Sequence, residues 1–288
     1  MDIKEFLNRK LKSDLKQITH KSLNSTFIGY SAIYDRVVFV KVFSSEQKMY
    51  TEKAINLEIN NRVLQSFKVT DIQDLFVLVM TDIDPSDVEE KMSEQLAYKM
   101  GQVLFDFHNK IKPFKNIRKS EDTFSYIEKT IDDLKSTKEK DILKKQFYII
   151  LKYKSFIQSD ILKHSNSVLH GDVGTRNYKF VNKNLVLIDY ERARLGPAYQ
   201  DFIKLFYEDF YLNKNLIKSF LNGYGFKKEF NVGTLTQIYL IFYTSVGIFK
   251  YTDKIESKHF KTIGEKMLAD VIDFLSDTTS VEYSCVLI

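Results

Sequence analysis

One segment of the sequence, residues 170–201, holds side chains whose types and spacing suit phosphoryl transfer. Asp172 and Asn177 lie five residues apart on one short loop, HGDVGTRN, and Asp189 follows at the end of an apolar run, LVLID. Phosphoryl transfer needs a carboxylate that accepts the proton of the attacking hydroxyl. It also needs carboxylate or amide oxygens that hold Mg²⁺, a hard cation that takes oxygen ligands and bridges phosphates.

The two ends of this segment resemble two motifs of one known family. HGDVGTRN resembles the H-G-D-x-x-x-x-N catalytic loop of the aminoglycoside phosphotransferase and choline kinase superfamily. The following stretch is similar to the metal segment of that family, D-[FWY]-E-x-[AS]-x-x-G-x-x-x-x-D, which is represented here by Asp189, Tyr190, Glu191, Ala193, Gly196 and Asp201. Both motifs occur in the usual order, each after a short apolar strand. The resemblance covers roughly residues 20–250, and a loop of solvated acids in an unrelated helical protein is the alternative.

The resemblance implies a role for each polar side chain of the loop. It makes Asp172 the catalytic base and Asn177 and Asp189 the ligands of Mg²⁺. ATP is the expected phosphate donor, although the sequence does not distinguish it from GTP.

Neighbouring residues are expected to support this loop. The resemblance implies that His170 braces the loop, that Asp201 fixes it from the following helix, and that His108 has a structural role. Arg176 lies beside the metal ligand, and two roles stay open for it. A guanidinium can contact a phosphate or an acidic group of the substrate, or it can pair with a neighbouring carboxylate.

An N-terminal lysine completes the expected nucleotide site. Lys41 is the only lysine within VVFVKVF, and a charge among apolar neighbours needs a partner unless it faces water on an edge strand. A kinase uses such a lysine to hold the phosphates, paired with a glutamate on the next helix. Glu58 and Glu52 are the candidates, and family spacing favours Glu58.

The remaining nucleotide contacts are expected in two short segments. The turn SLNST, residues 22–26, is similar to the polar loops of choline-kinase-like members, so Ser25 and Thr26 could reach phosphate. The adenine is expected at residues 79–82, where Met80 and Asp82 would contribute backbone groups.

Sequence periodicity predicts the elements that position these residues. Residues 2–16 form a short helix, 27–34 and 37–43 form a hairpin, and 75–80 form a buried strand. Residues 167–170 and 185–190 form a second small hairpin. Helices are expected over 46–66, 93–111, 121–135, 138–163, 198–211, 214–222, 233–252 and 257–276. The predicted fold is α+β, two-lobed and protein-kinase-like, with an antiparallel-sheet lobe over 1–82, a mainly helical lobe over 83–288, and the nucleotide between them.

Composition narrows the class of protein. The 288 residues include 17 Tyr and 23 Phe, ample for a core, but only 10 Gly and 3 Pro, which favours long helices. The net charge of +5 is spread along the chain, so we expect no nucleic-acid partner. The most apolar stretch, 235–249, is too short to span a membrane and predicts a buried helix. The single cysteine, Cys285, and the absence of a signal peptide favour the cytoplasm, and the C-terminal CVLI resembles a prenylation signal only by coincidence.

The sequence therefore predicts an ATP- and Mg²⁺-dependent phosphotransferase that acts on a hydroxyl group of a small molecule. A protein or peptide kinase is the second hypothesis, disfavoured because no G-x-G-x-x-G loop is present. A catalytically silent nucleotide-binding module is the third, disfavoured because the polar set is intact. The net positive chain predicts a neutral or mildly charged acceptor. An aminoglycoside stays the alternative because Glu208 and Asp209 follow the motif.

Overall fold

The computed structural model describes residues 2–18, 24–70, 74–88, 91–119, 123–227 and 232–276. The chain divides into two compact units. The first unit comprises residues 1–87, 114–117 and 179–193, and the second comprises 88–113, 118–178 and 194–288. A segment late in the sequence, 179–193, therefore packs with the N-terminal part of the chain. The lobe boundary between residues 82 and 83 stays a prediction. Cys285 lies outside the described residues.

The first unit is built on an antiparallel sheet of five strands in the order β1-β2-β3-β5-β4. A second, smaller sheet has the order β6-β8-β9. The elements are α1 (Ile3–Leu11), β1 (Lys16–Gln17), β2 (Ser25–Ser31), β3 (Arg36–Phe43), α2 (Glu46–Ile59), β4 (Val63–Val69), β5 (Leu75–Thr81), β6 (Ser86–Asp87), β8 (Tyr178–Val181) and β9 (Asn184–Leu187).

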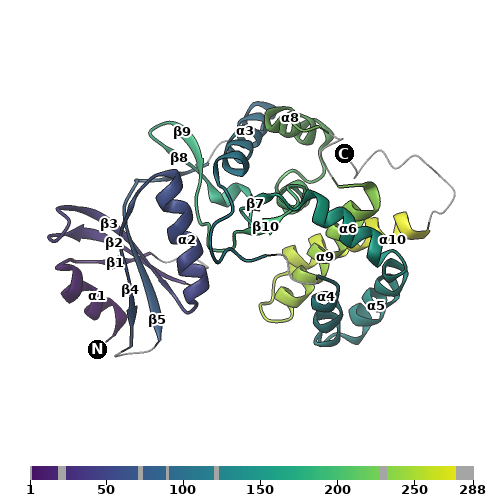
Figure 1. Cartoon of the computed structure of the whole chain (residues 1–288), viewed down its shortest axis with the longest axis horizontal. Coiled ribbons are helices and arrows are strands. Elements are labelled where there is room, and N and C mark those ends of the chain that lie inside the picture. The colour runs from purple at the N-terminus through teal and green to yellow at the C-terminus, as the bar shows by residue number, and fades with distance from the viewer. Residues whose placement is uncertain are drawn as a thin grey trace. The chain divides into compact units, whose positions relative to one another are not determined.

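Strand alternation gives the five-stranded sheet two apolar faces, each covered by one helix (Figure 1). On one face, Leu7 and Leu11 of α1 pack against Val38, Val40 and other buried residues of β2 to β5. The opposite face carries Phe43, Leu78 and Met80, which pack against Met49 of α2. Because α1 covers one face of the sheet and α2 the other, the side chains of β3 are covered on both faces, which explains the nearly continuous apolar run VVFVKVF.

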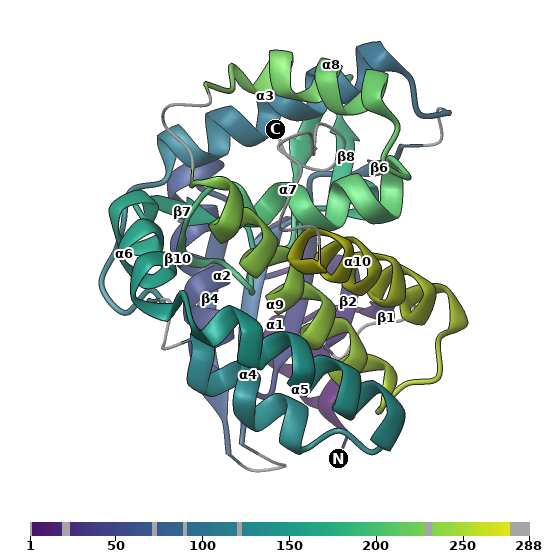
Figure 2. The same cartoon turned by 90° about the vertical axis from the view of Figure 1, so that its right-hand side faces the viewer.

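The second unit is mainly helical (Figure 2). Its only sheet among the described residues is the antiparallel pair β7–β10. The elements are α3 (Glu94–Lys110), α4 (Thr123–Asp132), α5 (Thr137–Leu151), α6 (Lys154–His164), β7 (Ser167–Leu169), the 3₁₀ turn η1 (Thr175–Asn177), β10 (Arg194–Gly196), α7 (Gln200–Lys204), the π-helical turn η2 (Leu205–Asp209), α8 (Lys214–Tyr224), α9 (Thr234–Thr252) and α10 (Lys258–Ser276).

Helices α3 and α8 lie side by side because two glycines let their backbones approach (Figure 2). A Cβ at Gly101 would lie 2.1 Å from the carbonyl oxygen of Phe220, and one at Gly223 would lie 2.0 Å from that of Tyr98. Neither contact can be relieved by rotating a side chain, since both involve backbone atoms. The pair of helices therefore depends on the absence of side chains at these positions.

Most predicted elements are confirmed, and the α+β class with them. Three predictions are wrong. The single helix expected over 138–163 is interrupted at residues 152 and 153, which separate α5 from α6. The helix expected over 46–66 ends at Ile59, because Asn61 adopts a left-handed conformation and the chain continues as strand β4. The hairpin expected between 167–170 and 185–190 does not form: β7 pairs with β10, and β9 pairs with β8. Which strand pairs with which depends on segments far apart in the sequence, and local periodicity cannot identify those segments.

The apolar stretch 235–249 belongs to α9, where most side chains are buried. Across the residues that the structure describes, none of the helices combines the length and the apolar character that crossing a membrane would need.

Replacing Gly101 by alanine tests the close approach of α3 and α8. Helix propensity alone would make this change stabilising by about 1 kcal/mol. The backbone clash outweighs that gain, so we expect the free energy of unfolding in urea to fall by roughly 1–3 kcal/mol. Gly247→Ala in α9 is the matched control, since nothing lies within 4 Å of a Cβ there. The control should be neutral or stabilising, and equal effects at both positions would contradict the explanation.

Candidate active site

A buried lysine organises the polar side chains of the first unit. Lys41 on β3 lies among three carboxylates: its Nζ is 3.6 Å from Oε2 of Glu52, 2.9 Å from Oε2 of Glu191, and in a short contact with Oδ1 of Asp189. Glu191 also accepts from Lys48 of α2 at 3.0 Å and from the side chain of Asn24. Ion pairs with Lys41 and Lys48 thereby connect the segment that carries Asp189 and Glu191 to the sheet and to α2.

The charged groups of this cluster shift the pKa values of one another. Burial alone would lower the pKa of Lys41, but Glu52, Asp189 and Glu191 outweigh it and raise that pKa, so the ammonium stays charged. Burial raises the pKa of Glu52, against the lowering effect of Lys41 and Arg62. Arg62 reaches Glu52 through Asn56, which accepts from Arg62 at 2.6 Å and donates to Glu52 at 3.0 Å. The lysine is therefore fixed in place with its charge retained.

The predicted partner of Lys41 is wrong: Glu52 makes the ion pair, and Glu58 does not. Glu52 is 1% exposed, whereas Glu58 lies on the exposed side of α2. The buried face of α2 runs through Met49, Glu52, Ile55 and Asn56, spaced by three and four residues. Six residues after Glu52, a helix has turned about 600°, which places Glu58 well away from that face.

The two predicted phosphate-contacting residues of β2 face opposite sides of the sheet. Thr26 pairs with Lys41 in the β2–β3 register, so both side chains point to the α2 face. The Thr26 hydroxyl is buried and has no hydrogen-bond partner among the described residues. Ser25 is the adjacent residue, so alternation directs its side chain to the α1 face, away from Lys41. Of the loop 22–26, residues 22 and 23 lie outside the described part of the chain.

The segment predicted to hold the adenine lies at the end of β5. Met80 is fully buried, and β5 pairs there with β3 on one side and β4 on the other. The backbone N–H groups of Thr81 and Asp82 donate to Arg62 at 2.8 Å and to Val37 at 3.2 Å. These two donors are thus already used by neighbouring strands, and the adenine role of Met80 and Asp82 stays a prediction.

In the second unit, one buried carboxylate holds the predicted catalytic loop. Asp201 accepts from the backbone N–H of His170 at 2.7 Å, from that of Gly171 at 2.9 Å, and from Nε2 of His108 at 3.0 Å. Burial would raise the pKa of Asp201, but the hydrogen bond from His108 and the neighbouring cationic groups keep it below its ordinary value. Gly171 has φ 81°, a left-handed conformation that glycine adopts at no steric cost. The glycine and Asp201 together fix the turn before Asp172.

The carboxylate of Asp172, the predicted base, pairs with two cations. Its Oδ2 lies 2.6 Å from Arg176 and its Oδ1 lies 3.0 Å from Nζ of Lys204 on α7. Its backbone N–H lies 3.3 Å from Nδ1 of His170, which is fully buried. Of the two roles left open for Arg176, the geometry matches the tie to a neighbouring carboxylate.

Asn177 is also fixed from within the loop. Its Nδ2 donates to the backbone carbonyl of Asp172 at 2.7 Å, which leaves Oδ1 as the ligand atom of the side chain. The 3₁₀ turn η1 that contains it is held by Asp209, whose Oδ1 accepts from the N–H of Thr175 at 3.2 Å. Asp209 is part-buried, and that burial raises the pKa of its carboxyl group.

The predicted Mg²⁺ ligands have the right chemistry for that ion. Asp189 offers a carboxylate whose side chain is 42% exposed, and Asn177 offers an amide oxygen. Mg²⁺ is commonly held by one or two such protein oxygens plus phosphates and water. Within the described residues, no group of three or more His, Cys, Asp or Glu side chains is arranged to hold a metal. Asn177 and Asp189 belong to different units, and their joint role as Mg²⁺ ligands stays a prediction.

Three residues of these clusters were not predicted as site residues: Glu191, Lys204 and Asp209. Glu191 was quoted only as part of the motif, although its position two residues after Asp189 is a usable signal. Lys204 and Asp209 follow Asp201 by three and eight residues. Lys204 contacts a residue 32 positions earlier in the chain, and Asp209 lies in the π-helical turn, which the sequence did not indicate.

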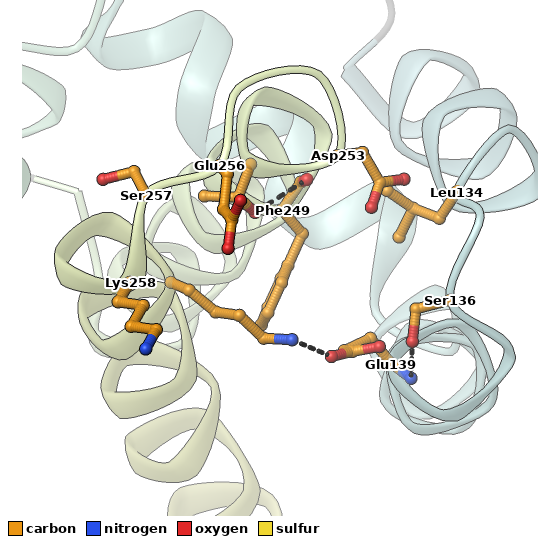
Figure 3. Close-up of a pocket in the computed structure, with 10 residues that line it drawn as sticks. Leu134, Ser136, Glu139, Phe249, Asp253, Glu256, Ser257 and Lys258 are labelled. Carbon is orange, nitrogen blue, oxygen red and sulfur yellow. Dashed lines mark hydrogen bonds and ion pairs between the residues drawn. The ribbon is translucent and has the colours of Figure 1, made fainter.

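The second unit also contains a cavity of about 250 Å³ between the end of α4, the start of α5, the end of α9 and the start of α10. Figure 3 shows Glu139 of α5 across from Lys258 of α10, and Glu139 pairs with Lys261 at 2.6 Å. Among the described residues that line it, none belongs to the predicted site. The cavity is therefore separate from the residues predicted to form the active site.

Substitutions on α2 test which glutamate serves Lys41. Glu52→Gln removes a buried charge that compensates the lysine, so we expect the free energy of unfolding to fall by about 1–3 kcal/mol. Glu58→Gln on the same helix is the matched control and should change it by less than about 0.5 kcal/mol. Urea unfolding monitored by circular dichroism gives both values. A larger effect at Glu58 than at Glu52 would contradict the pairing.

Comparison with solved structures shows the fold. The chain is similar to an aminoglycoside phosphotransferase mutant in its apo form, with 12% identity, a TM-score of 0.69, and coverage of 96% of this chain and 100% of that one. It is also similar to a choline kinase from Streptococcus pneumoniae, with 14% identity, a TM-score of 0.62, and coverage of 96% and 98%. A spectinomycin phosphotransferase solved with ADP and spectinomycin has 12% identity, a TM-score of 0.58, and coverage of 95% and 96%. At these identities the likeness confirms the predicted protein-kinase-like fold.

Sequence comparison identifies the family. None of the curated proteins matches this chain by sequence. The phosphotransferase enzyme family matches residues 43–234, which include Lys41's partner Glu52, the loop of Asp172 and the segment from Asp189 to Asp201. This match spans most of the chain and confirms the resemblance found in the sequence. The chain belongs to the phosphotransferase enzyme family.

Proposed function

We propose that this phosphotransferase transfers the γ-phosphate of ATP to a hydroxyl group of a small molecule, in a reaction that requires Mg²⁺. The observation that carries the proposal is the loop 170–177, in which Asp172 is held by its backbone and by both carboxylate oxygens. Family membership supports the reaction class. Similar folds that bind ADP with spectinomycin, or AMP-PNP with amicoumacin, support a nucleotide and a small acceptor.

In the proposed reaction, Asp172 accepts the proton of the acceptor hydroxyl as its oxygen attacks the γ-phosphorus. The new O–P bond forms while the bond between the γ-phosphorus and the β–γ bridging oxygen breaks, and ADP leaves. Asn177 and Asp189 would hold Mg²⁺, which neutralises charge on the phosphates when bound. Lys41 would hold the phosphates, and the unpaired hydroxyl of Thr26 lies on the same face of the sheet. No phosphoenzyme is required.

The acceptor is proposed to be neutral or mildly charged. A polycation needs a strongly acidic pocket. The two acids that follow the motif already have partners: Glu208 lies 3.4 Å from Lys204, and Asp209 accepts from Thr175. Arg176 and Lys204 add positive charge around Asp172. This balance of charge disfavours an aminoglycoside and gives no support to a protein substrate.

Asp172→Asn tests the base. Because the lost group acts in the transition state, we expect turnover to fall by about 10²–10⁴-fold with little change in affinity for ADP. Phosphate transfer is measured with the hydroxyl compound that gives the highest rate in a screen with ATP and Mg²⁺. Asp106→Asn, at an exposed position on α3, is the control and should behave like the wild type. Near wild-type turnover in Asp172→Asn would show that the base is assigned wrongly.

Steady-state kinetics with two classes of acceptor test the substrate proposal. Neutral polyhydroxyl compounds and kanamycin-type aminoglycosides are compared with the same enzyme and ATP. We expect the aminoglycosides to have the lower kcat/KM, because the acids near Asp172 are already paired. An aminoglycoside KM near 1 μM together with turnover of about 10 s⁻¹ would overturn the proposal in favour of a resistance kinase.

A further inference from the structure

One short stretch of chain, residues 201–209, contacts the catalytic loop at three separate points. Asp201 accepts from the backbone N–H groups of residues 170 and 171. Lys204 contacts the carboxylate of Asp172 at 3.0 Å. Asp209 accepts from the N–H of Thr175 at 3.2 Å. Two of these contacts hold the backbone, and only Lys204 acts on the carboxylate itself.

The two cations that contact Asp172 differ in how firmly they are held. The side chain of Lys204 is 21% exposed, and its ammonium also lies 3.4 Å from Glu208 and 5.5 Å from the centre of the Phe260 ring of α10. A cation over an aromatic face is attracted by the ring quadrupole. The side chain of Arg176 is 54% exposed. Lys204 is therefore confined on several sides, whereas more than half of the Arg176 side chain is exposed to solvent.

A π-helical turn directly follows Lys204, which is the last residue of α7. In η2 the N–H of Phe210 donates to the carbonyl of Leu205 at 3.0 Å, an i→i+5 bond. Two successive acids of this turn make separate contacts: Glu208 reaches Lys204 at the i,i+4 spacing of an ordinary helix, and Asp209 reaches Thr175. Such turns within helices occur often at functional sites.

We propose that Lys204 is a positioning residue for Asp172: it holds Oδ1 and so directs Oδ2 toward the acceptor hydroxyl when Arg176 withdraws. The proposal rests on the role of Asp172 as the base. A base must keep one oxygen for the proton that it accepts. Lys204 leaves Oδ2 for that purpose, because an ammonium binds as a point charge. Without Lys204, the guanidinium of Arg176 can take both oxygens in a bidentate pair and turn the carboxylate away from the acceptor.

Kinetics of Lys204→Met and Lys204→Arg test this role in the full-length enzyme. We expect Lys204→Met to lower kcat by at least about tenfold, because a small misplacement of a reacting group can cost about a hundredfold. The KM for ATP should change by less than about twofold, since Lys204 holds the base and not the nucleotide. Lys204→Arg should recover little of the loss, because a second guanidinium can bind both oxygens of Asp172. Lys218→Met, at an exposed position on α8, is the control and should match the wild type.

A merely structural role for Lys204 would give a different result. It would lower the melting temperature but would not lower kcat selectively while leaving the KM for ATP unchanged. Assays are therefore run well below the melting temperature of each variant. If Lys204→Met folds poorly, Lys204→Gln replaces it with the same measurements. A kcat of Lys204→Met within about twofold of the wild type, or full recovery of kcat in Lys204→Arg, overturns the proposal. If the proposal for Lys204 is overturned while Asp172→Asn is inactive in the same assay, only the role of Lys204 is refuted. If Asp172→Asn is fully active, the proposed function itself fails.

Discussion

A carboxylate can be buried only if donors replace the water that it loses, and much of the second unit follows from meeting that requirement at Asp201. Its oxygens take two backbone N–H groups of the catalytic loop and one nitrogen of His108. His108 in turn contacts the hydroxyl of Tyr224 on α8 at 2.7 Å, which links α3, α8 and the loop. The loop is rigid because the alternative is an unpaired buried charge, which would cost several kcal/mol.

The first unit meets the same requirement with the signs reversed. Here the buried charge is the ammonium of Lys41, and three carboxylates from two distant parts of the sequence compensate it. A chain of side chains continues from Glu52 through Asn56 to Arg62. Each unit thus arranges its reactive groups around one desolvated charge whose partners are fixed by folding. Fixed charges of this kind need little reorganisation when a reaction begins.

Chemistry and local pattern agree at several residues of the candidate site. Asp172, Asn177 and Asp189 stand in motifs that follow apolar strands, and Lys41 is a lone charge within an apolar run; the roles assigned to them stay predictions. The choice between Glu52 and Glu58 failed because family spacing was given more weight than the periodicity of α2, whose buried face includes only Glu52. Helix α2 was extended too far because Asn60 and Asn61 were not read as a helix end. Lys204 and Asp209 could not be found locally, since their loop partners Asp172 and Thr175 lie 32 and 34 positions earlier in the sequence.

The π-helical turn also limits how this part of the chain can vary in length. Deleting one residue from Leu205–Asp209 would allow an ordinary α-helical turn, which is the more favourable local structure. Every later residue of the segment would then rotate by about 100° relative to those before it. Asp209 would lose Thr175 even though no side chain had been substituted. Such a change in length would therefore separate Asp209 from the loop, while Asp201 and Lys204, which precede the turn, would keep their contacts with it.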